Sequence, residues 1–263
     1  MKSRRPASAA SGCFRALIDA WLTEQAHGGA LADRLLIGGS DDPWLNGAVM
    51  ELAARIGSGA LVGYTPNGTI AGLELLANRR IDVSALHWGP AERSEVQHPA
   101  LLGRLAGECT LIRLARRAQG VIVRPGLPAT DLQTLAAFDY RWAMRQPGAG
   151  SQHFLQVMLN AAGLRLEDCR PVVTAYSERQ AAACVAQGLA DCAPGTGAAA
   201  AEFGLGFIRL GEEAFDLALP RSVFFRQLFQ ELLATLASAP LRAHAGRLGG
   251  YDLSPLGTVR PAA

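Results

Sequence analysis

The chain has 263 residues, of which 49% are hydrophobic and 18% are charged, and its formal net charge at pH 7 is +2. This composition indicates a globular protein that is long enough for one large domain or two smaller lobes, and it excludes a disordered or fibrous chain. Lys2 is the only lysine, and arginine pairs such as Arg116-Arg117 are typical of solvated faces or of ion-pair partners rather than of phosphate contacts. We therefore expect no direct nucleic-acid binding by this chain.

The cysteines and the N-terminal sequence bear on the compartment. Five cysteines are scattered along the chain, and no Cys-x-x-Cys pair or histidine spacing indicates a metal site. Reduced thiols favour a cytoplasmic protein. Arg15 and Asp19 interrupt the first apolar run too early for a signal sequence, and no stretch approaches the roughly 20 apolar residues of a membrane span. A periplasmic location would require an export signal that has been removed or missed.

The first 33 residues form a lead in which Phe14 to Gln25 is predicted to be a short amphipathic helix, ended by Gly28-Gly29. This lead is too short for a helix-turn-helix domain. A buried strand is then predicted for 34–38. Asp42 is a suitable N-cap and Pro43 a suitable first residue for the helix that follows it.

An alternation of strands and helices continues from that point. Strands are predicted at 60–64 and 81–86, with a helix at 70–78 between them. Successive strand-helix-strand units imply a parallel sheet with right-handed crossovers, in which ligands bind at the carboxyl ends of the strands. Ser40, Thr69 and His87 all follow such strand ends. A hydrogen-bonded role is favoured over a catalytic one for His87.

The second half of the chain repeats this design. The expected strands are 109–116, 120–123, 140–144, 171–175, 206–209 and 214–219, and the expected helices are 131–136, 153–162, 177–187 and 221–238. Ser177 and Gln180 fit a capping box. Glu178 could meet a ligand, but a helix-dipole role is sufficient to explain its position. The last helix is predicted to pack on the first lobe.

A glycine-rich stretch from Met144 to Gln152 lies between a predicted strand and a predicted helix. Its small residues leave several backbone N–H groups at the helix start able to point at one bound group. Unpaired N–H groups and the positive end of the helix dipole both favour negative charge. The stretch therefore indicates either an anion cradle or only a tight connection.

Motifs for several catalytic chemistries are absent from the sequence. Without a Gly-Lys-Ser/Thr segment there is no phosphate-binding P-loop, and Gly195-Thr196-Gly197 lacks the third glycine of a dinucleotide fingerprint. No Gly-x-Ser-x-Gly elbow occurs, and Ser151 and His153 point to different helix faces. We expect no enzyme activity and no cofactor.

Five segments together resemble the periplasmic-binding-protein-like (type 2) domain family, the substrate-binding domain of molybdate- and tungstate-responsive bacterial regulators and related binding proteins. They are 35–43 (LLIGGSDDP), 67–73 (NGTIAGL), 81–88 (IDVSALHW), 145–151 (RQPGAGS) and 185–192 (VAQGLADC). The resemblance implies an α/β fold of two lobes, each a mostly parallel sheet flanked by helices, with two crossing strands as the hinge. It implies that residues 34–124 and 213–263 form lobe 1 and that residues 125–212 form lobe 2.

The resemblance also implies a binding site in the cleft between the lobes. Its residues would be Ser40, Asn67 and Thr69 from lobe 1 and Arg145, Gly150, Ser151, Tyr176 and Ser177 from lobe 2. The implied function is binding or sensing of a small molecule, such as a molybdate- or tungstate-like oxyanion, with a partner protein or a homodimer as a further partner. The alternatives are an enzyme on the same fold or a binder of a small organic ligand that packs on Trp44, Trp88 or Tyr176.

Overall fold

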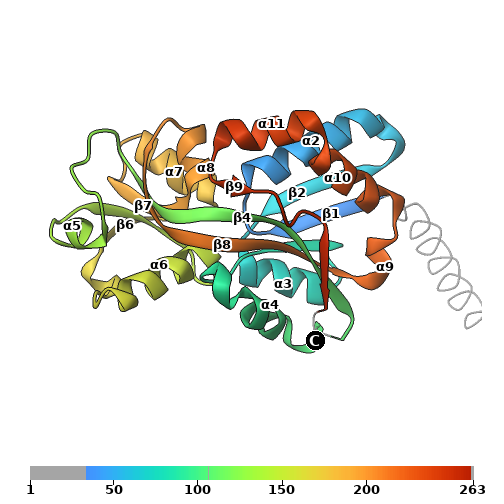
Figure 1. The fold of residues 1–263 in the computed structure, drawn as a ribbon, viewed down its shortest axis with the longest axis horizontal. Coiled ribbons are helices and arrows are strands. Elements are labelled where there is room, and N and C mark those ends of the chain that lie inside the picture. Colours follow the sequence, from blue (N-terminus) through green and yellow to red (C-terminus); the bar gives the residue numbers. More distant parts are fainter. Residues whose placement is uncertain (1–33, 106, 262–263) are drawn as a thin grey trace, which may run out of the picture.

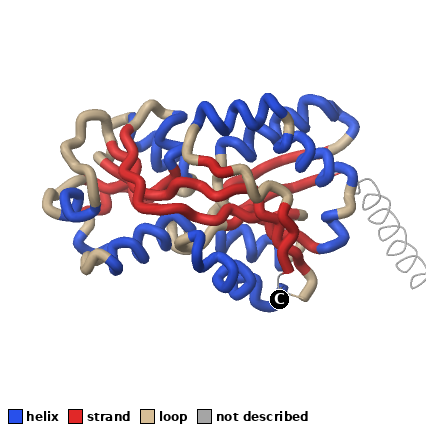
Figure 2. Tube along the Cα trace, in the orientation of Figure 1, coloured by secondary structure: helices blue, strands red, loops and turns tan. Residues whose placement is uncertain are grey.

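The computed structural model describes residues 34–105 and 107–261, and the helix predicted for Phe14 to Gln25 lies outside this part of the chain. A ten-stranded sheet runs through the molecule, with helices on both of its faces (Figures 1 and 2). The strands are β1 (Arg34–Gly39), β2 (Leu61–Pro66), β3 (Val83–Leu86), β4 (Cys109–Val123), β5 (Arg141–Arg145), β6 (Arg170–Ala175), β7 (Cys192–Thr196), β8 (Gly206–Pro220), β9 (Tyr251–Asp252) and β10 (Thr258–Pro261).

The helices alternate with the strands along most of the chain. They are α2 (Pro43–Ile56), α3 (Thr69–Ala77), α4 (Ser94–Leu102), α5 (Leu132–Ala136), α6 (Gly150–Ala161), α7 (Glu178–Ala186), α8 (Gly197–Glu202), α9 (Arg221–Phe224), α10 (Gln227–Ala237) and α11 (Ala239–Leu248). Asp42 caps α2 as predicted, because its Oδ1 accepts a hydrogen bond from the Leu45 N–H at 2.7 Å. No helix of residues 34–105 and 107–261 is long and apolar enough to cross a membrane.

The sheet has two parallel parts that are linked by two long antiparallel strands. Strand β1 pairs in parallel with β2 and β3, and β5 pairs in parallel with β6 and β7. Strands β4 and β8 pair with each other over their full lengths and run along the long axis of the molecule through both parts (Figure 1). The prediction of two mostly parallel lobes joined by two crossing strands is confirmed. The exact lobe boundaries stay a prediction, because β8 is continuous across residue 212.

Each crossing strand was predicted as two shorter strands. The structure joins 109–116 to 120–123 in β4, and 206–209 to 214–219 in β8. Register shifts lie between Arg113 and Ala115 and between Gln119 and Gly120. Such irregularities place an extra residue on one strand, so they interrupt the alternation of side chains by which a strand is recognised in a sequence. The strand interruptions in the prediction were therefore wrong.

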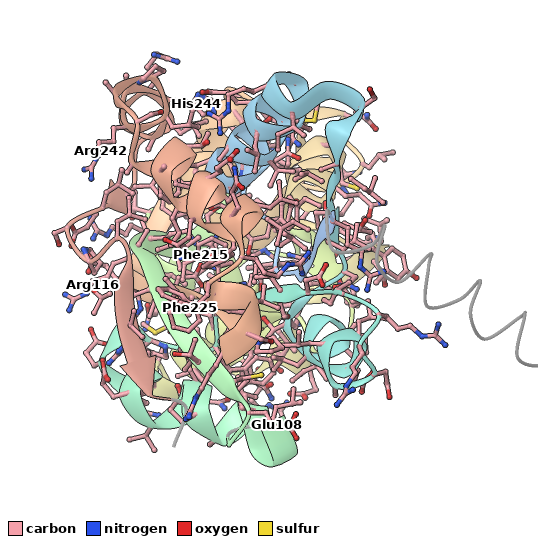
Figure 3. The ribbon with its side chains drawn as sticks, turned by 90° about the vertical axis from the view of Figure 1, so that its right-hand side faces the viewer. Glu108, Arg116, Phe215, Phe225, Arg242 and His244 are labelled. Carbon is pink, nitrogen blue, oxygen red and sulfur yellow. The ribbon has the colours of Figure 1, made fainter. Side chains whose placement is uncertain are left out.

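Separate hydrophobic cores support the two lobes. The core of the first lobe includes Trp44, Phe215, Phe229 and Leu236 and lies between the sheet, α2 and α10. Figure 3 looks onto this end of the molecule. The predicted helix 221–238 does pack here, but it is broken into α9 and α10 at Phe225, whose side chain is 79% exposed. Strands β4, β5, β7 and β8 and helices α5 and α6 contribute to the second core, which includes Trp142, Leu155 and Leu159.

Candidate ligand site between the lobes

The hydroxyl groups of the first lobe lie together at the carboxyl ends of its strands. Ser40 follows β1 and Thr69 begins α3, and their hydroxyl oxygens are 2.8 Å apart although 29 positions separate them in the sequence. Thr69 donates to the His87 carbonyl oxygen at 3.0 Å, so Ser40 is the donor to Thr69. Asn67 accepts from the Gly39 N–H at 2.8 Å and so holds the neighbouring loop. Ser40 and Thr69 are both buried.

The second lobe contributes a cation beside the start of a helix. Arg145 ends β5, and its guanidinium donates to the Ser151 hydroxyl at 3.0 Å and to the Ala175 carbonyl at 3.2 Å. Burial lowers the pKa of Arg145 from its ordinary value, although Glu178 acts in the opposite direction. Helix α6 begins at Gly150, and its N-cap residue Ala149 supplies no side-chain hydrogen bond. The N–H groups of this first helical turn therefore need partners from elsewhere.

The two sets of residues meet at His87, which follows β3. A Cβ atom on Gly150 would lie 2.7 Å from His87 Nε2 and even closer to the His87 carbonyl oxygen. Thr69 donates to the same carbonyl oxygen from the first lobe. Only glycine permits so close an approach without a shift of the backbone. The segment between Met144 and Gln152 is therefore a contact between the lobes as well as a strand-to-helix turn.

Further hydrogen bonds join the lobes directly. The Ile70 N–H donates to the Gly148 carbonyl oxygen at 3.2 Å. On the other side of the site, the Arg179 N–H donates to Asp41 Oδ2 at 3.0 Å. Burial raises the pKa of Asp41, while the hydrogen bond from Arg179 acts in the opposite direction. These contacts hold the two lobes against each other in a closed arrangement.

Tyr176 and Ser177 stand at the edge of this site. The Tyr176 side chain is 63% exposed, and its backbone N–H donates to Gln180 Oε1 at 2.7 Å. Ser177 caps α7 as predicted, because its hydroxyl accepts from the Gln180 N–H at 3.0 Å. A ligand contact from either residue stays a prediction.

Arg117 lies at the centre of a buried group of charges. Its side chain is 1% exposed, and its guanidinium donates to Asp42 Oδ2 at 2.8 Å and also to Glu213. The guanidinium carbon lies 4.0 Å from the centroid of the Phe215 ring. Gln119 donates to the other oxygen of Glu213 at 2.9 Å. Of the two roles expected for the Arg116-Arg117 pair, a solvated face or an ion-pair partner, Arg117 therefore has the second.

His87 lies between two carboxylates that come from different parts of the fold. Its Nδ1 hydrogen-bonds to Glu213 of β8, and its Nε2 is 3.3 Å from Glu178 Oε1 of α7. The second contact lacks hydrogen-bond geometry, and neither oxygen of Glu178 has a hydrogen-bond partner among the residues that the structure describes, although this residue is 1% exposed. Burial lowers the pKa of His87, but Glu213 and then Glu178 raise it to a net value above 6.5.

The pKa of Glu178 shifts in the opposite sense. Burial alone would raise it, but the neighbouring His87 and then the Arg117 charge lower it on balance. Its carboxylate is therefore ionised at neutral pH. The three residues His87, Glu178 and Glu213 place potential metal-ligand atoms within 4.8 Å of one another. The sequence prediction considered a ligand contact for Glu178 but favoured a helix-dipole role, and it did not select Glu213.

The aromatic candidates for a ligand contact have different surroundings. Trp44 is fully buried in the first core, with its ring centroid 5.7 Å from that of Tyr251, so it packs there and not on a ligand. Trp88 is stacked on His153 of α6, with 4.2 Å between centroids and 13° between the ring planes. Of these residues, Trp88 is the one that adjoins the junction at His87.

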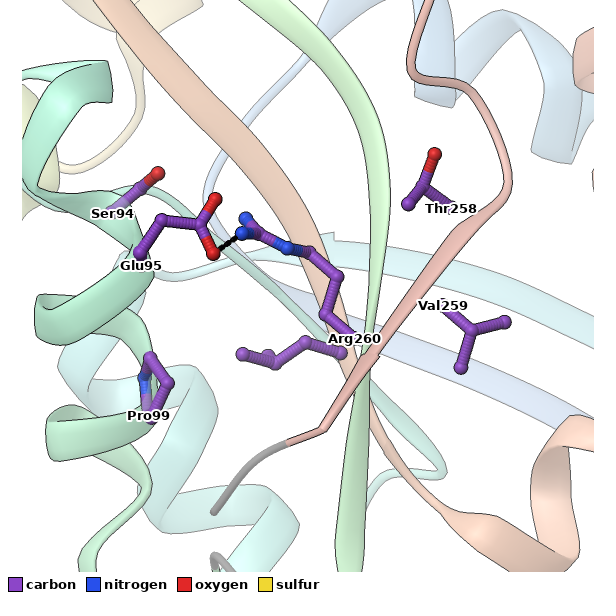
Figure 4. A pocket seen from close by; sticks show the side chains of 7 residues that line it. Ser94, Glu95, Pro99, Thr258, Val259 and Arg260 are labelled. Carbon is purple, nitrogen blue, oxygen red and sulfur yellow. Dashed lines mark ion pairs between the residues drawn. The ribbon is translucent and has the colours of Figure 1, made fainter.

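A separate cavity of about 490 Å³ lies on the outer side of the first lobe, between α4 and β10 (Figure 4). Arg260 reaches across it to pair with Glu95. None of the predicted site residues lines this cavity, which is bordered by Ser94, Glu95, Pro99, Leu111, Thr258, Val259 and Arg260. It is therefore distinct from the interlobe site.

The fold and the junction define a two-lobed domain for binding small ligands. Residues 50–237 match the PBP superfamily domain, and the chain belongs to this family. No curated protein matches the chain significantly.

Solved structures with the same fold come from proteins of several kinds. A substrate-binding protein with bound phosphate from Clostridium perfringens is 9% identical, with a TM-score of 0.60 over 86% of this chain and 100% of that one. PhnD1 from Prochlorococcus marinus, in complex with methylphosphonate, is 11% identical, with a TM-score of 0.55 over 85% and 93%. OxyR from Corynebacterium glutamicum, as a cysteine-to-serine mutant with bound H2O2, is 17% identical, with a TM-score of 0.54 over 94% and 81%. These identities are too low to show more than the fold.

Proposed function

We propose that this chain is a binding or sensing domain without catalysis, whose two lobes close on a small ligand that carries an oxyanion group. The observation that carries the proposal is that the predicted site residues of lobe 1 and those of lobe 2 meet at His87. Thr69 from lobe 1 and Gly150 from lobe 2 both reach its carbonyl oxygen. Residues that are far apart in the sequence thereby form one junction.

An oxyanion fits the donors at this junction. Arg145 offers a guanidinium, Ser151 accepts from Arg145 and keeps its own hydroxyl proton to donate, and α6 offers the N–H groups of its uncapped first turn. The hydroxyl groups of Ser40 and Thr69 lie beside them and can donate to a ligand once their protons turn away from Thr69 and from the His87 carbonyl. Donors of these kinds bind anions well when the fold already fixes their positions. Neighbours of the same fold that bind phosphate and methylphosphonate support this ligand class.

The charge of the junction favours some oxyanions over others. The buried carboxylates are Asp41, Asp42, Glu178 and Glu213, and the buried guanidinium groups are Arg117 and Arg145. A ligand with two full negative charges, such as molybdate or tungstate, would therefore need a compensating cation. A phosphate-like ligand can keep a proton and donate it in a hydrogen bond to a carboxylate. We rank phosphate and phosphonates above molybdate and tungstate for this reason.

The oxyanion can also belong to a small organic molecule. The stacked pair of Trp88 and His153 presents an aromatic surface beside the junction, on which an organic group could pack. As a sensor, the domain would act in the cytoplasm and would pass its closure to a partner protein, a second copy or a separate domain, since we expect no nucleic-acid binding by this chain.

A ligand screen tests the proposal. Phosphate, methylphosphonate, sulfate, molybdate and tungstate are each added to the chain, and the melting temperature and calorimetric affinity are measured. A ligand that binds only the folded chain raises the melting temperature. We expect phosphate or methylphosphonate to do so, and Arg145→Gln to abolish the effect.

The matched control is Arg141→Gln, on the same strand, because Arg141 is paired with Asp191 away from the junction. It should respond like the wild-type chain. If none of the five anions binds, or if the two variants respond equally, the oxyanion proposal is wrong.

A further inference from the structure

We propose that His87 and Glu178 bind a divalent metal ion of the Zn²⁺ type at the junction of the lobes. His87 Nε2 and Glu178 Oε1 are 3.3 Å apart. Two neighbouring ligand atoms on Zn²⁺, each about 2.0 to 2.2 Å from the metal, are separated by roughly 3.0 to 3.5 Å. The spacing of these two atoms therefore already suits a shared metal ion. Water or an oxygen atom of a bound ligand would complete the coordination.

The carboxylate of Glu178 gives the first support. It is 1% exposed, and neither of its oxygen atoms accepts a hydrogen bond within the described part of the chain. Burying an ionised carboxylate without hydrogen bonds is costly, and natural proteins rarely leave such a group without a partner. A metal ion supplies the missing interaction, and imidazole and carboxylate are both common Zn²⁺ ligands.

The opposite side of the imidazole ring gives a second, independent support. His87 Nδ1 lies on Glu213, so in the neutral ring the proton belongs on Nδ1, where it is donated to Glu213, and Nε2 then faces Glu178 with a free lone pair. Glu213 is itself fixed by Arg117 and by Gln119, which donates to it at 2.9 Å. Metal-binding histidines commonly donate their other N–H to a carboxylate in this way, which sets the tautomer and orients the ring. Glu213 is therefore a positioning residue for His87.

The charge balance points the same way. The junction contains four buried carboxylates and two buried guanidinium groups, so a divalent cation would bring the summed charge of these side chains close to zero. The two metal ligands belong to different lobes, since His87 follows β3 and Glu178 begins α7. Metal binding would therefore favour the closed state, because only that state brings both ligands together. This inference needs no oxyanion and can be tested without one.

The test uses the full chain after treatment with a chelator. Zn²⁺ is titrated by calorimetry, and Co²⁺ is added as a spectroscopic probe whose visible absorption reports coordination. We expect one Zn²⁺ per chain and an increase in the melting temperature. Glu178→Gln and His87→Gln should each weaken Zn²⁺ binding by more than about 10-fold, and Glu213→Gln should weaken it by about 10- to 100-fold, the range for partners of a metal-binding histidine.

Two matched variants control for binding elsewhere. Glu212→Gln changes the residue next to Glu213 in the sequence, and Glu212 is paired with Arg209. His244→Gln changes a histidine on α11 (Figure 3). Both should bind Zn²⁺ like the wild-type chain. Circular dichroism checks the fold of every variant. Glu178→Gln decides the result if His87→Gln does not fold, because the Glu178 side chain accepts no hydrogen bond from residues 34–105 and 107–261.

Three results would overturn the proposal. The wild-type chain could take up no Zn²⁺, Glu178→Gln could bind it as tightly as the wild type, or His244→Gln could weaken binding as much as His87→Gln does. Failure of the oxyanion screen alone would leave this inference standing, because the metal titration contains no oxyanion.

Discussion

Replacing Arg117 with methionine tests whether the buried charges stabilise the fold. The guanidinium joins Asp42, at the start of α2, to Glu213, on the crossing strand β8. Methionine fills much of the same volume and can still pack on Phe215, but it cannot donate a hydrogen bond. The change therefore isolates the charge from the packing.

The expected cost follows from what remains around the two carboxylates. Removing one partner of a buried ion pair destabilises a protein by about 3 to 5 kcal/mol, because the other charge stays buried. Tyr251 still donates to Asp42 at 2.7 Å, and Gln119 still donates to Glu213 at 2.9 Å. These retained donors place Arg117→Met near the lower end, at about 3 kcal/mol of unfolding free energy.

Urea unfolding at neutral pH measures this cost, with Arg116→Met as the control. Arg116 is the adjacent residue but is exposed (Figure 3), so its replacement should change stability by no more than about 0.5 kcal/mol. Adding Glu213→Gln to Arg117→Met should restore part of the loss, because one uncompensated carboxylate disappears. Equal stability of the two single variants would refute the assignment of a structural ion pair to Arg117.

Three further predictions follow from single contacts. Thr69→Val keeps the shape of the side chain but removes a hydroxyl, so we expect calorimetry to show about 1 to 3 kcal/mol weaker oxyanion binding, and unchanged affinity would exclude Thr69 from the site. Gly150→Ala places a Cβ 2.7 Å from His87 Nε2, so we expect the two lobes to move apart. X-ray scattering should then show a larger radius of gyration, and an unchanged radius would contradict the close approach of the lobes. Burial alone would raise the pKa of Asp216, but the hydrogen bond with His98 and other contacts lower this pKa below 3.8 on balance. The ionised Asp216 carboxylate therefore contributes its full stability above about pH 4, and this contribution is lost as the pH falls through the lowered pKa. Acid unfolding followed by circular dichroism should therefore be less steep for Asp216→Asn, and identical pH profiles would contradict this assignment.

Local features of the fold could be predicted because they depend on residues close together in the sequence. Asp42 and Ser177 cap helices whose N–H groups lie three positions further on. Strand β1 was predicted to within one residue. The short helix α11 was missed, although Ser238 at its N-cap and a proline in its first turn are both recognisable signals.

The junction could be predicted only in part, because it depends on contacts between distant residues. Ser40 and Thr69 could be expected to lie together, as they do, since both follow ends of parallel strands, which must lie at one edge of a sheet. Glu178 was considered as a ligand contact but not selected, because a helix-dipole role explained its position well enough. Its contact with His87 spans 91 positions, from 87 to 178, and requires the two lobes to close. No local pattern carries that information.

The spacing of charged residues on the two crossing strands could have been used to predict how these strands pair. Arg113 and Arg117 on β4 face Asp216 and Glu213 on β8 in the antiparallel register, so each arginine lies opposite an acid. The arginines are four positions apart and the acids three, and the register shift between Arg113 and Ala115 absorbs the difference. Opposite charges buried on paired strands can fix the register, since a slip would leave each charge without its partner. The same pairs therefore align the hinge and place Glu213 beside His87.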